Sequence, residues 1–393
     1  MYPLTIELVD FLLSDRARAA LDELMHADLS DIAILPGLTE LRRNFTPSEA
    51  SVLIDQARLR QRASLKFPNS DRLFFTDEAL QQASSFGIAR FRAERFAKYR
   101  RVADLGSGIG ADTLALAEVV PELTAIECNS VLARLLTANV TAMGLTSRVR
   151  VVCADWTQLS LNIEAAFVDP SRRVGGRRVF RLDEMNPSLS SIMALFTQVP
   201  DVAVKVAPSV VDDEIPPDVE VEFVSEQGEC KEALLLFGGM RRGVARTATL
   251  LPGAHRLDST APITNIPTSV PQEFLYEPDV AILRATLVRA LATQLNAAQL
   301  DASIAYITSN TLVPTPFARV WNVIKHSSFH LKTLNKWLRE MEAGEVIVKK
   351  RGSPIEPETF QHRLKITPGG PTITVFLTRM CGRPWMIIGR EIK

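Results

Sequence analysis

The fold of this 393-residue chain follows from the segment Val102-Ala103-Asp104-Leu105-Gly106-Ser107-Gly108-Ile109-Gly110. Its apolar run predicts a buried strand, which ends in an acidic residue and passes into a glycine turn that opens a helix. Glycines in such a turn let a ligand approach the backbone, and the helix N-terminus offers N–H donors. The glycine spacing is G-x-G-x-G, whereas dinucleotide-binding folds use G-x-G-x-x-G. The segment therefore predicts a strand, turn and helix that bind a nucleotide-like ligand.

Short apolar runs alternate with helical segments on the C-terminal side of this turn. This alternation is typical of a parallel α/β sheet, with strands predicted at 102–105, 123–127, 149–153, 165–168 and 202–206. Two further runs, 219–225 and 233–237, are separated by a polar segment that is too short for a helical crossover. They predict an antiparallel hairpin at the edge of the sheet.

The regions around the sheet have different patterns. Residues 1–98 have apolar spacings of three and four, and Thr46-Pro47-Ser48-Glu49 is a helix-start signal, so we expect a helical region. Residues 99–250 hold the α/β domain, and the spaced prolines of 251–278 predict an extended linker. Residues 279–393 predict a small α+β module with helices near 279–295 and 331–343 and strands near 303–308, 345–349, 372–378 and 385–390.

Polar side chains follow several of the predicted strands. Glu127 ends the second strand nineteen residues after Gly108, where a carboxylate can accept both hydroxyls of a ribose. Asp155 and Trp156 follow the third strand and offer an acceptor for an adenine amino group and an aromatic face. Asp169-Pro170-Ser171-Arg172-Arg173 follows the fourth. Because the carboxyl ends of parallel strands border one crevice, these residues are expected to share a ligand site.

The region from Val102 to Phe237 resembles the class I S-adenosylmethionine-dependent methyltransferases. The family's glycine motif matches Asp104, Gly106, Gly108 and Gly110, its ribose-binding acid matches Glu127, its adenine-side acid matches Asp155, and its catalytic-strand motif matches Asp169-Pro170. The resemblance implies a Rossmann-like, seven-stranded domain with S-adenosylmethionine as cofactor. It implies a cofactor-binding set of Asp104, Gly106, Ser107, Gly108, Gly110, Glu127, Cys128, Asp155, Trp156 and Asp169.

The whole chain is similar to bacterial methyltransferases that carry a C-terminal THUMP-like domain. This similarity is carried by the Asp169–Arg173 motif, the proline-rich linker, the segment 314–319 and the segment 347–352. Residues 66–76 and the helix ending near Arg95-Phe96 resemble, more loosely, the lead-in helix of trimethylguanosine-synthase-like RNA methyltransferases. THUMP modules are associated with RNA binding, so the resemblance implies rRNA or tRNA as the partner.

The motif after the fourth strand is the candidate catalytic element, with Asp169, Pro170 and Arg172. Methyltransferases that act on amino groups of nucleic acids typically have two prolines and an aromatic residue there, but here Ser171 and Arg172 replace the second proline and the aromatic residue. The Arg172 plane can stack on a base or hold a phosphate. Asp169 can orient the nucleophile or accept its proton, or alternatively cap a turn. No cysteine lies in a recognisable nucleophile motif.

Arginines are concentrated after this motif, and a fixed cluster of cations beside a cofactor crevice favours a polyanion. Arg181 completes the cluster, and the candidate RNA-binding residues are Arg172, Arg173, Arg177, Arg178, Lys349, Lys350 and Arg351. Two alternatives remain open. The arginines can pair with Asp183 and Glu184 at the surface, and lysines on an edge strand can serve to discourage aggregation.

The composition does not exclude an RNA partner. The chain has 45 Lys+Arg and 45 Asp+Glu, but residues 317–393 contain 14 Lys+Arg and only 6 Asp+Glu. Neutrality is therefore a cancellation between a basic C-terminal module and an acidic remainder, which predicts local RNA binding. The four cysteines form no C-x-x-C pair and suit a reducing compartment, and the five histidines lack metal-ligand spacing. Without a long apolar segment or a signal peptide, we expect a cytoplasmic protein with no membrane or metal partner.

These features favour an S-adenosylmethionine-dependent methyltransferase that acts on a structured RNA, such as a base of rRNA or tRNA. A methyltransferase for a protein or small metabolite is the first alternative. The second is a non-catalytic RNA-binding factor that retains the cofactor fold, because the altered DPSR motif is compatible with lost turnover.

Overall fold

The computed structural model describes residues 3–30, 32, 34–171, 173–174, 177–179 and 181–392, and for 173–174 and 177–178 the backbone alone. The chain divides into two compact units. One comprises Met1–Glu220 and Ala233–Arg242, and the other Val221–Glu232 and Gly243–Lys393. The predicted boundaries at residues 98 and 250 do not coincide with this division.

The larger sheet has nine strands within the described residues, in the order β11-β10-β8-β9-β7-β4-β1-β2-β3. Its strands are β1 (Arg101–Leu105), β2 (Glu122–Glu127), β3 (Val149–Cys153), β4 (Ala165–Val168), β7 (Asp201–Val206), β8 (Glu220–Glu226), β9 (Glu229–Leu236), β10 (Arg246–Leu251) and β11 (His255–Asp258). The sequence predicts seven strands, so the observed sheet contains two strands, β10 and β11, that were not predicted. The predicted hairpin forms as β8 and β9 but is not at the edge, because β10 pairs in parallel with β8.

The central strands have the parallel pairing that the sequence predicts. β1 pairs with β2 and β4, β2 with β3, and β4 with β7, all in parallel. β9 pairs antiparallel with β7. The crossover helices are α7 (Ala111–Val119) after β1, α8 (Ser130–Ala142) after β2 and α9 (Leu189–Leu195) before β7. The carboxyl ends of β1, β2, β3 and β4 therefore lie at the same edge of the sheet.

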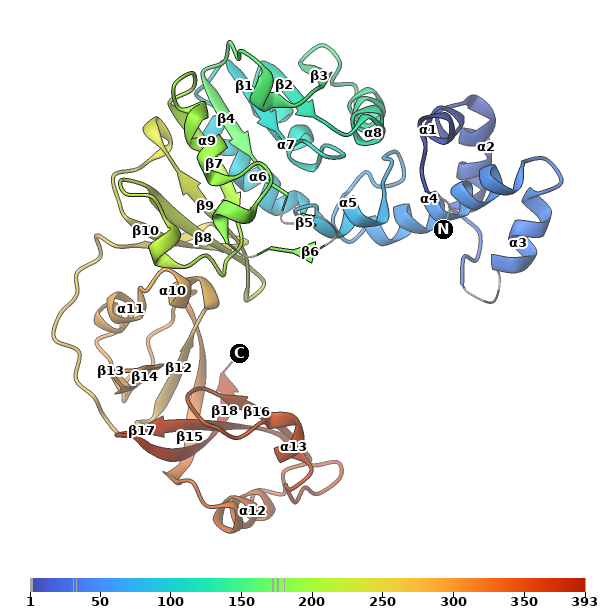
Figure 1. Cartoon of the computed structure of the whole chain (residues 1–393). Coiled ribbons are helices and arrows are strands. Elements are labelled where there is room, and N and C mark those ends of the chain that lie inside the picture. Colours follow the sequence, from blue (N-terminus) through green and yellow to red (C-terminus); the bar gives the residue numbers. More distant parts are fainter. Residues whose placement is uncertain are drawn as a thin grey trace. The chain divides into compact units, whose positions relative to one another are not determined.

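The N-terminal region is helical, as predicted, and shares a core with the sheet's helices. Its elements are α1 (Ile6–Leu12), α2 (Asp15–Leu24), α3 (Ile34–Leu41), α4 (Pro47–Ala63), α5 (Asp77–Gln82), α6 (Phe86–Ala93) and the short 3₁₀ helix η1 (Glu94–Phe96). Thr46 and Glu49 form the predicted capping box at the start of α4. Val9 and Leu53 belong to one buried cluster with Leu135 of α8, and α1 lies beside α8 (Figure 1). This shared core explains why the first unit is continuous across residue 98.

Between β4 and α9 the backbone forms a small antiparallel hairpin, β5 (Arg173–Val174) with β6 (Arg177–Arg178). Further 3₁₀ turns are η2 (Trp156–Gln158), η3 (Leu182–Glu184), η4 (Asp212–Glu214) and η5 (Gly238–Met240). None of the helices in the described part of the chain combines the length and apolar character that a membrane crossing requires.

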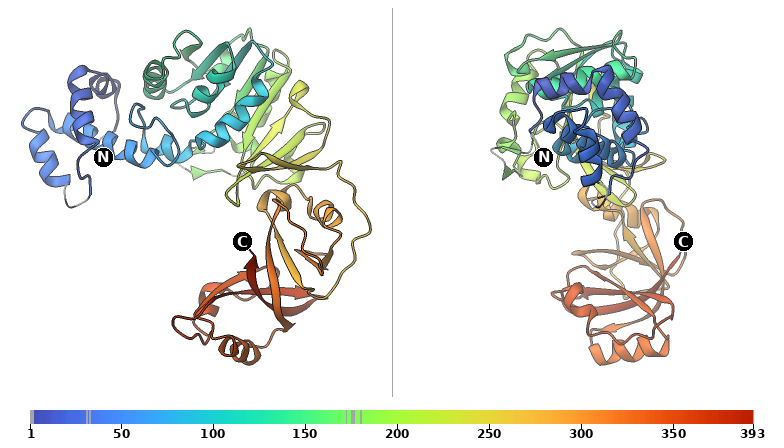
Figure 2. Two further views of the ribbon diagram at one scale, coloured as in Figure 1. Left: turned by 180° about the vertical axis from the view of Figure 1, so that it is seen from behind. Right: turned by 90° about the vertical axis from the view of Figure 1, so that its right-hand side faces the viewer.

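The C-terminal module contains a sheet that the structure describes with seven strands, in the order β13-β14-β12-β15-β18-β17-β16. They are β12 (Phe274–Pro278), β13 (Ala298–Asp301), β14 (Ile304–Ser309), β15 (Ala318–Ser328), β16 (Glu345–Lys350), β17 (Thr372–Met380) and β18 (Arg383–Ile392). Its helices are α10 (Val280–Arg284), α11 (Val288–Gln294), α12 (Leu331–Glu340) and α13 (Pro357–Gln361). Figure 2 shows α12 at one end of the module and α10 and α11 at the other.

Some C-terminal elements differ from the sequence prediction. The expected linker over 251–278 includes the strands β11 and β12, whose pairing partners lie elsewhere in the chain. The helix expected over 279–295 is split into α10 and α11, because Thr286 between them has a φ of +60°. The longest strand, β15, has no predicted counterpart. Its burial alternates irregularly around a bulge between Val323 and Lys325, which obscures the two-residue period.

Candidate functional site

The glycine turn between β1 and α7 is held by backbone hydrogen bonds to the neighbouring strand. The N–H groups of Gly106 and Ser107 both donate to Ile126 O, at 3.0 and 3.1 Å. Ser107 Oγ donates to Asp104 O at 2.7 Å, and Gly110 N donates to Ser107 O at 2.9 Å. The turn is therefore fixed against the ends of β1 and β2 before any ligand binds.

The conformation of this turn requires glycine at Gly106 and at Gly108 for different reasons. Gly106 has a φ of +84°, and a Cβ there would lie 3.0 Å from Asp169 O, so a side chain would push against the end of β4. Gly108 has a φ of +55°, and a Cβ there would meet no protein atom within 4 Å. Open space beside a backbone held in the left-handed region is what a ligand needs to contact the turn closely.

Glu127 ends β2 and faces the glycine turn. Its Oε2 accepts from Gly108 N at 2.9 Å, and its Oε1 accepts from Asn129 N at 2.8 Å. Oε2 has a further lone pair, and the second lone pair of Oε1 is met only by the weakly donating Cys128 thiol, so Glu127 can accept hydrogen bonds from two ligand hydroxyls if one of them replaces the thiol. Cys128 Sγ lies 3.6 Å from Glu127 Oε1, and burial and the Glu127 charge raise the pKa of the Cys128 thiol. A thiol in that setting is a poor nucleophile.

The two residues predicted on the adenine side lie directly after β3. Asp155 Oδ1 caps the turn η2, accepting from Thr157 N at 2.9 Å and from Thr157 Oγ1 at 2.7 Å. Trp156 is only 7% exposed, so most of its ring packs inside the protein. Asp155 is therefore well placed to accept from a base, whereas Trp156 offers little open aromatic surface.

Asp104 is the centre of a buried polar network. The sequence identified Asp104 as part of the glycine motif but did not predict its burial or its neighbours. It is 1% exposed, Thr113 Oγ1 donates to its Oδ2, and its Oδ1 has no hydrogen-bond partner in the described structure. Burial, with the nearby Asp112 charge, raises the pKa of Asp104 to about 7. Arg92 is also 1% exposed and pairs with Asp112 at 2.5 Å. Arg92 of α6 thus offsets the negative charge of Asp112, one of the two acidic residues next to the glycine turn.

Asn139 of α8 is a supporting residue that sequence reasoning missed. Its Oδ1 accepts from Phe74 N at 2.7 Å, and its Nδ2 donates to Phe74 O at 3.0 Å and to Ile109 O at 2.9 Å. These bonds connect the segment before α5 to the glycine turn. The signal that could have found it is a polar Asn among the apolar residues of α8, because such a side chain needs several hydrogen-bond partners when the helix packs.

Asp169 follows β4 and is paired with a lysine that sequence reasoning also missed. Lys205 Nζ lies 2.7 Å from Asp169 Oδ2. The side chain of Lys205 is 12% exposed and that of Asp169 is 33% exposed. In β7 (DVAVKV), Lys205 interrupts an otherwise apolar buried run, and that interruption was the available signal. Pro170 follows Asp169 at the same strand end and is buried.

The predicted arginine cluster is described only in part. Arg172 and the side chains of Arg173, Arg177 and Arg178 lie outside the described residues. Arg181 is described, and its Nε lies 3.3 Å from Glu214 Oε1. The expected alternative partners Asp183 and Glu184 are in η3, close to Arg181 in sequence, but Arg181 forms its ion pair with Glu214.

The predicted basic run at the end of β16 is engaged within its own module. Lys349 Nζ pairs with Glu277 Oε2, and Arg351 lies 3.6 Å from Glu277 Oε1. Lys350 Nζ lies 2.5 Å from Glu356 Oε1. Much of the charge of this run is therefore offset by acids that tertiary structure brings beside it.

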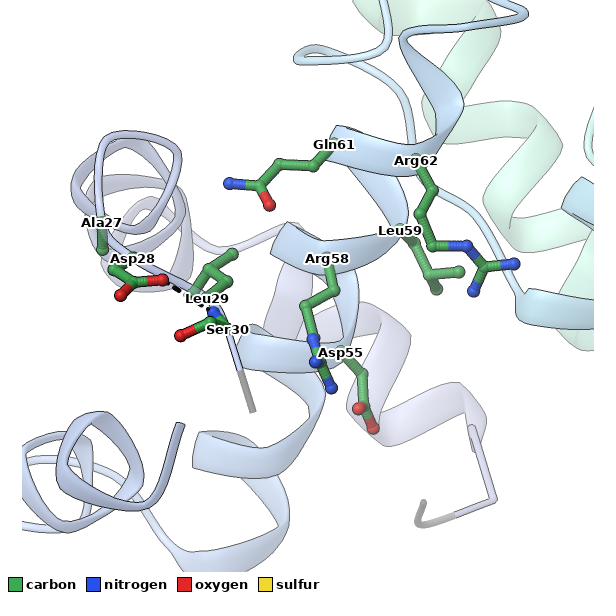
Figure 3. Close-up of a pocket in the computed structure, with 9 residues that line it drawn as sticks. All are labelled: Ala27, Asp28, Leu29, Ser30, Asp55, Arg58, Leu59, Gln61 and Arg62. Carbon is green, nitrogen blue, oxygen red and sulfur yellow. Dashed lines mark hydrogen bonds between the residues drawn. The ribbon is translucent and has the colours of Figure 1, made fainter. Parts of the chain in front are cut away.

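A separate hollow of about 640 Å³ lies in the N-terminal region, between α4 and the segment after α2 (Figure 3). It shares no residue with the strand-end site. Arg62 at its rim pairs with Asp77 at 2.6 Å. Among the described residues, no group of three or more His, Cys, Asp or Glu is arranged to hold a metal ion.

The strand-end site fits a nucleoside with a charged substituent. Gly108 leaves open space at the turn, Glu127 can accept from two hydroxyls, and Asp104 keeps one buried carboxyl oxygen without a partner. Asp169 lies at the next strand end, and the backbone oxygen of Asp169 is close to Gly106. The site therefore combines a nucleoside cradle with a carboxylate that can face a second substrate.

Comparison with known proteins supports this interpretation. Two proteins named uncharacterized S-adenosylmethionine-dependent methyltransferases, from Mycobacterium tuberculosis strains CDC 1551 / Oshkosh and H37Rv, are each 30% identical over 339 residues. The alignments cover 84% of this chain and 92% of each relative.

The solved structure of a protein from Porphyromonas gingivalis W83, named provisionally as a methyltransferase, has the same fold. It covers 97% of this chain with a TM-score of 0.80 at 20% identity, and all of its own chain is matched. A family model described as THUMP domain-like matches residues 318–391, and a domain of unknown function matches residues 5–63.

Proposed function

Because this chain belongs to the S-adenosylmethionine-dependent methyltransferases, we propose that it transfers a methyl group from S-adenosylmethionine to a structured RNA. The observation that carries the RNA substrate is the match of residues 318–391 to a THUMP-like model, because THUMP modules are associated with RNA binding. The charge distribution supports it, since residues 317–393 have 14 Lys+Arg against 6 Asp+Glu. An excess of cations in one module is typical of proteins that contact phosphates.

In this proposal the strand-end residues hold the cofactor. Glu127 accepts hydrogen bonds from the ribose hydroxyls and Asp155 from the adenine. Gly108 lets the cofactor approach the backbone, while Gly106, Ser107 and Gly110 give the turn its shape. Asp104 supports the turn from below through Thr113. S-adenosylmethionine, when bound, supplies a methyl group already activated on a sulfonium. The protein therefore has mainly to align the acceptor with it.

Asp169 is the proposed group that orients the acceptor and receives its proton. Its Oδ2 is occupied by Lys205, which leaves Oδ1 to accept a hydrogen bond from the RNA. Pro170 follows Asp169 and restricts the backbone at that strand end. Arg172 is the third candidate catalytic residue. That its side chain contacts a base or a phosphate remains a prediction from the sequence.

The test compares modified nucleosides in rRNA and tRNA from wild-type and gene-deletion cells by mass spectrometry. We expect one methylated nucleoside to disappear in the deletion strain and to return with the wild-type gene. Asp169→Ala should not restore it, although the purified variant should still bind RNA. Unchanged nucleosides together with methyl transfer to a protein fraction would show that the substrate is not RNA.

A further inference from the structure

The helix α12 carries positive charge along its solvent side. Leu334 and Leu338 are fully buried against β16, β17 and β18. Lys332, Lys336 and Arg339 are exposed. They are four and three residues apart, so they lie on one side of the helix. The sequence of α12 thus separates an apolar side, which holds the helix to the sheet, from a basic side.

Asn335 brings two further cations to the same helix. Its Nδ2 donates to Arg363 O at 3.0 Å, and its Oδ1 accepts from Lys365 N at 2.8 Å. Asn is a poor helix former, and here its side chain is buried with both ends used. This bond pair fixes the segment 363–365 beside α12. Arg363 and Lys365 are both exposed, so α12 and the segment that Asn335 holds beside it together carry five exposed cations.

α12 has one acidic residue, Glu340, and most of the positive charge of the five cations is not offset by it. Glu340 accepts from Lys325 of β15 at 2.6 Å and lies 3.8 Å from Lys336. Lys332, Arg363 and Lys365 have no ion pair within the described residues. The run 349–351 differs in this respect, because each of its members is paired with Glu277 or Glu356.

We infer that Lys332, Lys336, Arg339, Arg363 and Lys365, the α12 basic surface, contact the phosphate backbone of the RNA. This inference rests on the proposed function and identifies which part of the module meets the substrate. Lysine ammonium groups on a rigid helix contact phosphates as point charges and carry no sequence information. Binding through this surface should therefore be strongly dependent on salt and weakly dependent on base sequence.

The experiment measures binding of the full chain to a fluorescein-labelled 30-nucleotide RNA hairpin by anisotropy, from about 50 to about 200 mM salt. The test variant is K332E/K336E, with R363E/K365E as a second variant from the other segment. The matched control is R289E/R390E, which makes the same charge change in the same module. Arg289 is exposed on α11, and Arg390 is exposed near the end of β18 that pairs with Asn322. Both lie outside the α12 basic surface.

We expect each test variant to raise the Kd at least about tenfold at ~100 mM salt and to flatten the salt slope by about two. The control should change the Kd less than about threefold, because long-range charge is screened at that salt. All variants should have the circular-dichroism spectrum and melting profile of wild type, which shows that the changed C-terminal module is folded, and all should bind S-adenosylhomocysteine like wild type.

The remaining outcomes separate the two levels of the proposal. If wild type binds the hairpin and the test variants bind equally well, the surface is wrong but the RNA substrate stands. If the test and control variants weaken RNA binding equally, the inference about the α12 basic surface is also wrong, since binding would then depend only on the net charge of the module. If wild type binds no RNA at ~50 mM salt, both proposals fail. Tighter binding to polyglutamate than to the hairpin would assign the surface to an acidic protein and overturn the inference.

Discussion

Lys205 Nζ lies 2.7 Å from Asp169 Oδ2, although Lys205 is in β7 and Asp169 directly follows β4. The parallel register explains the pairing, because Val168 is opposite Val204 and the next residues along the two strands are Asp169 and Lys205. The lysine holds one carboxylate oxygen in place, and in the proposed function the other oxygen accepts from the substrate.

We expect Lys205→Met to reduce methyl transfer roughly 100-fold, because the carboxylate loses the cation that orients it. Binding of S-adenosylhomocysteine should change less than about threefold, since the described side-chain hydrogen bond of Lys205 is with Asp169 and not with the glycine turn, Glu127 or Asp155. Transfer of tritiated methyl groups to RNA from gene-deletion cells, with calorimetry of S-adenosylhomocysteine, measures both quantities. Lys205→Arg keeps the charge and should recover part of the activity. Equal loss of cofactor binding in Lys205→Met would show a structural role instead.

Glu127→Gln should weaken binding of S-adenosylhomocysteine by roughly 10- to 100-fold, because a carboxylate that accepts from ribose hydroxyls is replaced by a neutral amide. Isothermal calorimetry measures the change. The amide oxygen can accept from only one of Gly108 N and Asn129 N, and the amide NH2 then faces the other N–H, so the melting temperature should fall as well. An unchanged affinity would exclude Glu127 from the cofactor site.

Gly108→Ala tests whether a ligand occupies the space beside the turn. Gly108 and Gly144 have φ values of +55° and +70°, and a Cβ at either meets no protein atom within 4 Å. Alanine should therefore cost a similar ~1 kcal/mol of stability at each position. Only Gly108→Ala should also weaken S-adenosylhomocysteine binding, by about tenfold or more. If the two variants bind the cofactor product equally, the space at Gly108 is not part of the site.

The buried carboxyl of Asp104 predicts a pH-dependent difference in stability. Its pKa is raised from 3.8 to about 7, first by burial and then by Asp112. The protonated form therefore stabilises the folded state fully below pH 3.8, and this contribution is lost as the pH rises through about 7. Asp104→Asn cannot ionise, so its melting temperature relative to wild type should rise between about pH 5 and about pH 8. A difference that is constant over this range would contradict the raised pKa.

Local sequence was sufficient to predict the elements that depend on short-range pattern. The glycine turn between Asp104 and Gly110, the parallel strands β1 to β4 and β7, and the capped helix α4 all follow from periodicity and turn chemistry. The class of enzyme and its cofactor followed from the resemblance that these motifs carry, and the relatives confirm both. The irregular strand β15 and the strand β12 were missed, because their pairing partners are distant in the chain. The strand β11 pairs with the neighbouring β10, and it was missed because its four mostly polar residues form no apolar run.

What the sequence determined by itself is the order of strands and helices and the set of polar residues at the strand ends, because these depend on neighbours along the chain. Only the tertiary structure decided which charges meet. It placed Lys205 beside Asp169, Arg92 beside Asp112 and Glu277 beside Lys349. It also fixed Arg363 and Lys365 against α12 through Asn335. The physical reason is that a charge is offset or left available by groups that folding brings close in space, and sequence spacing does not specify those distances.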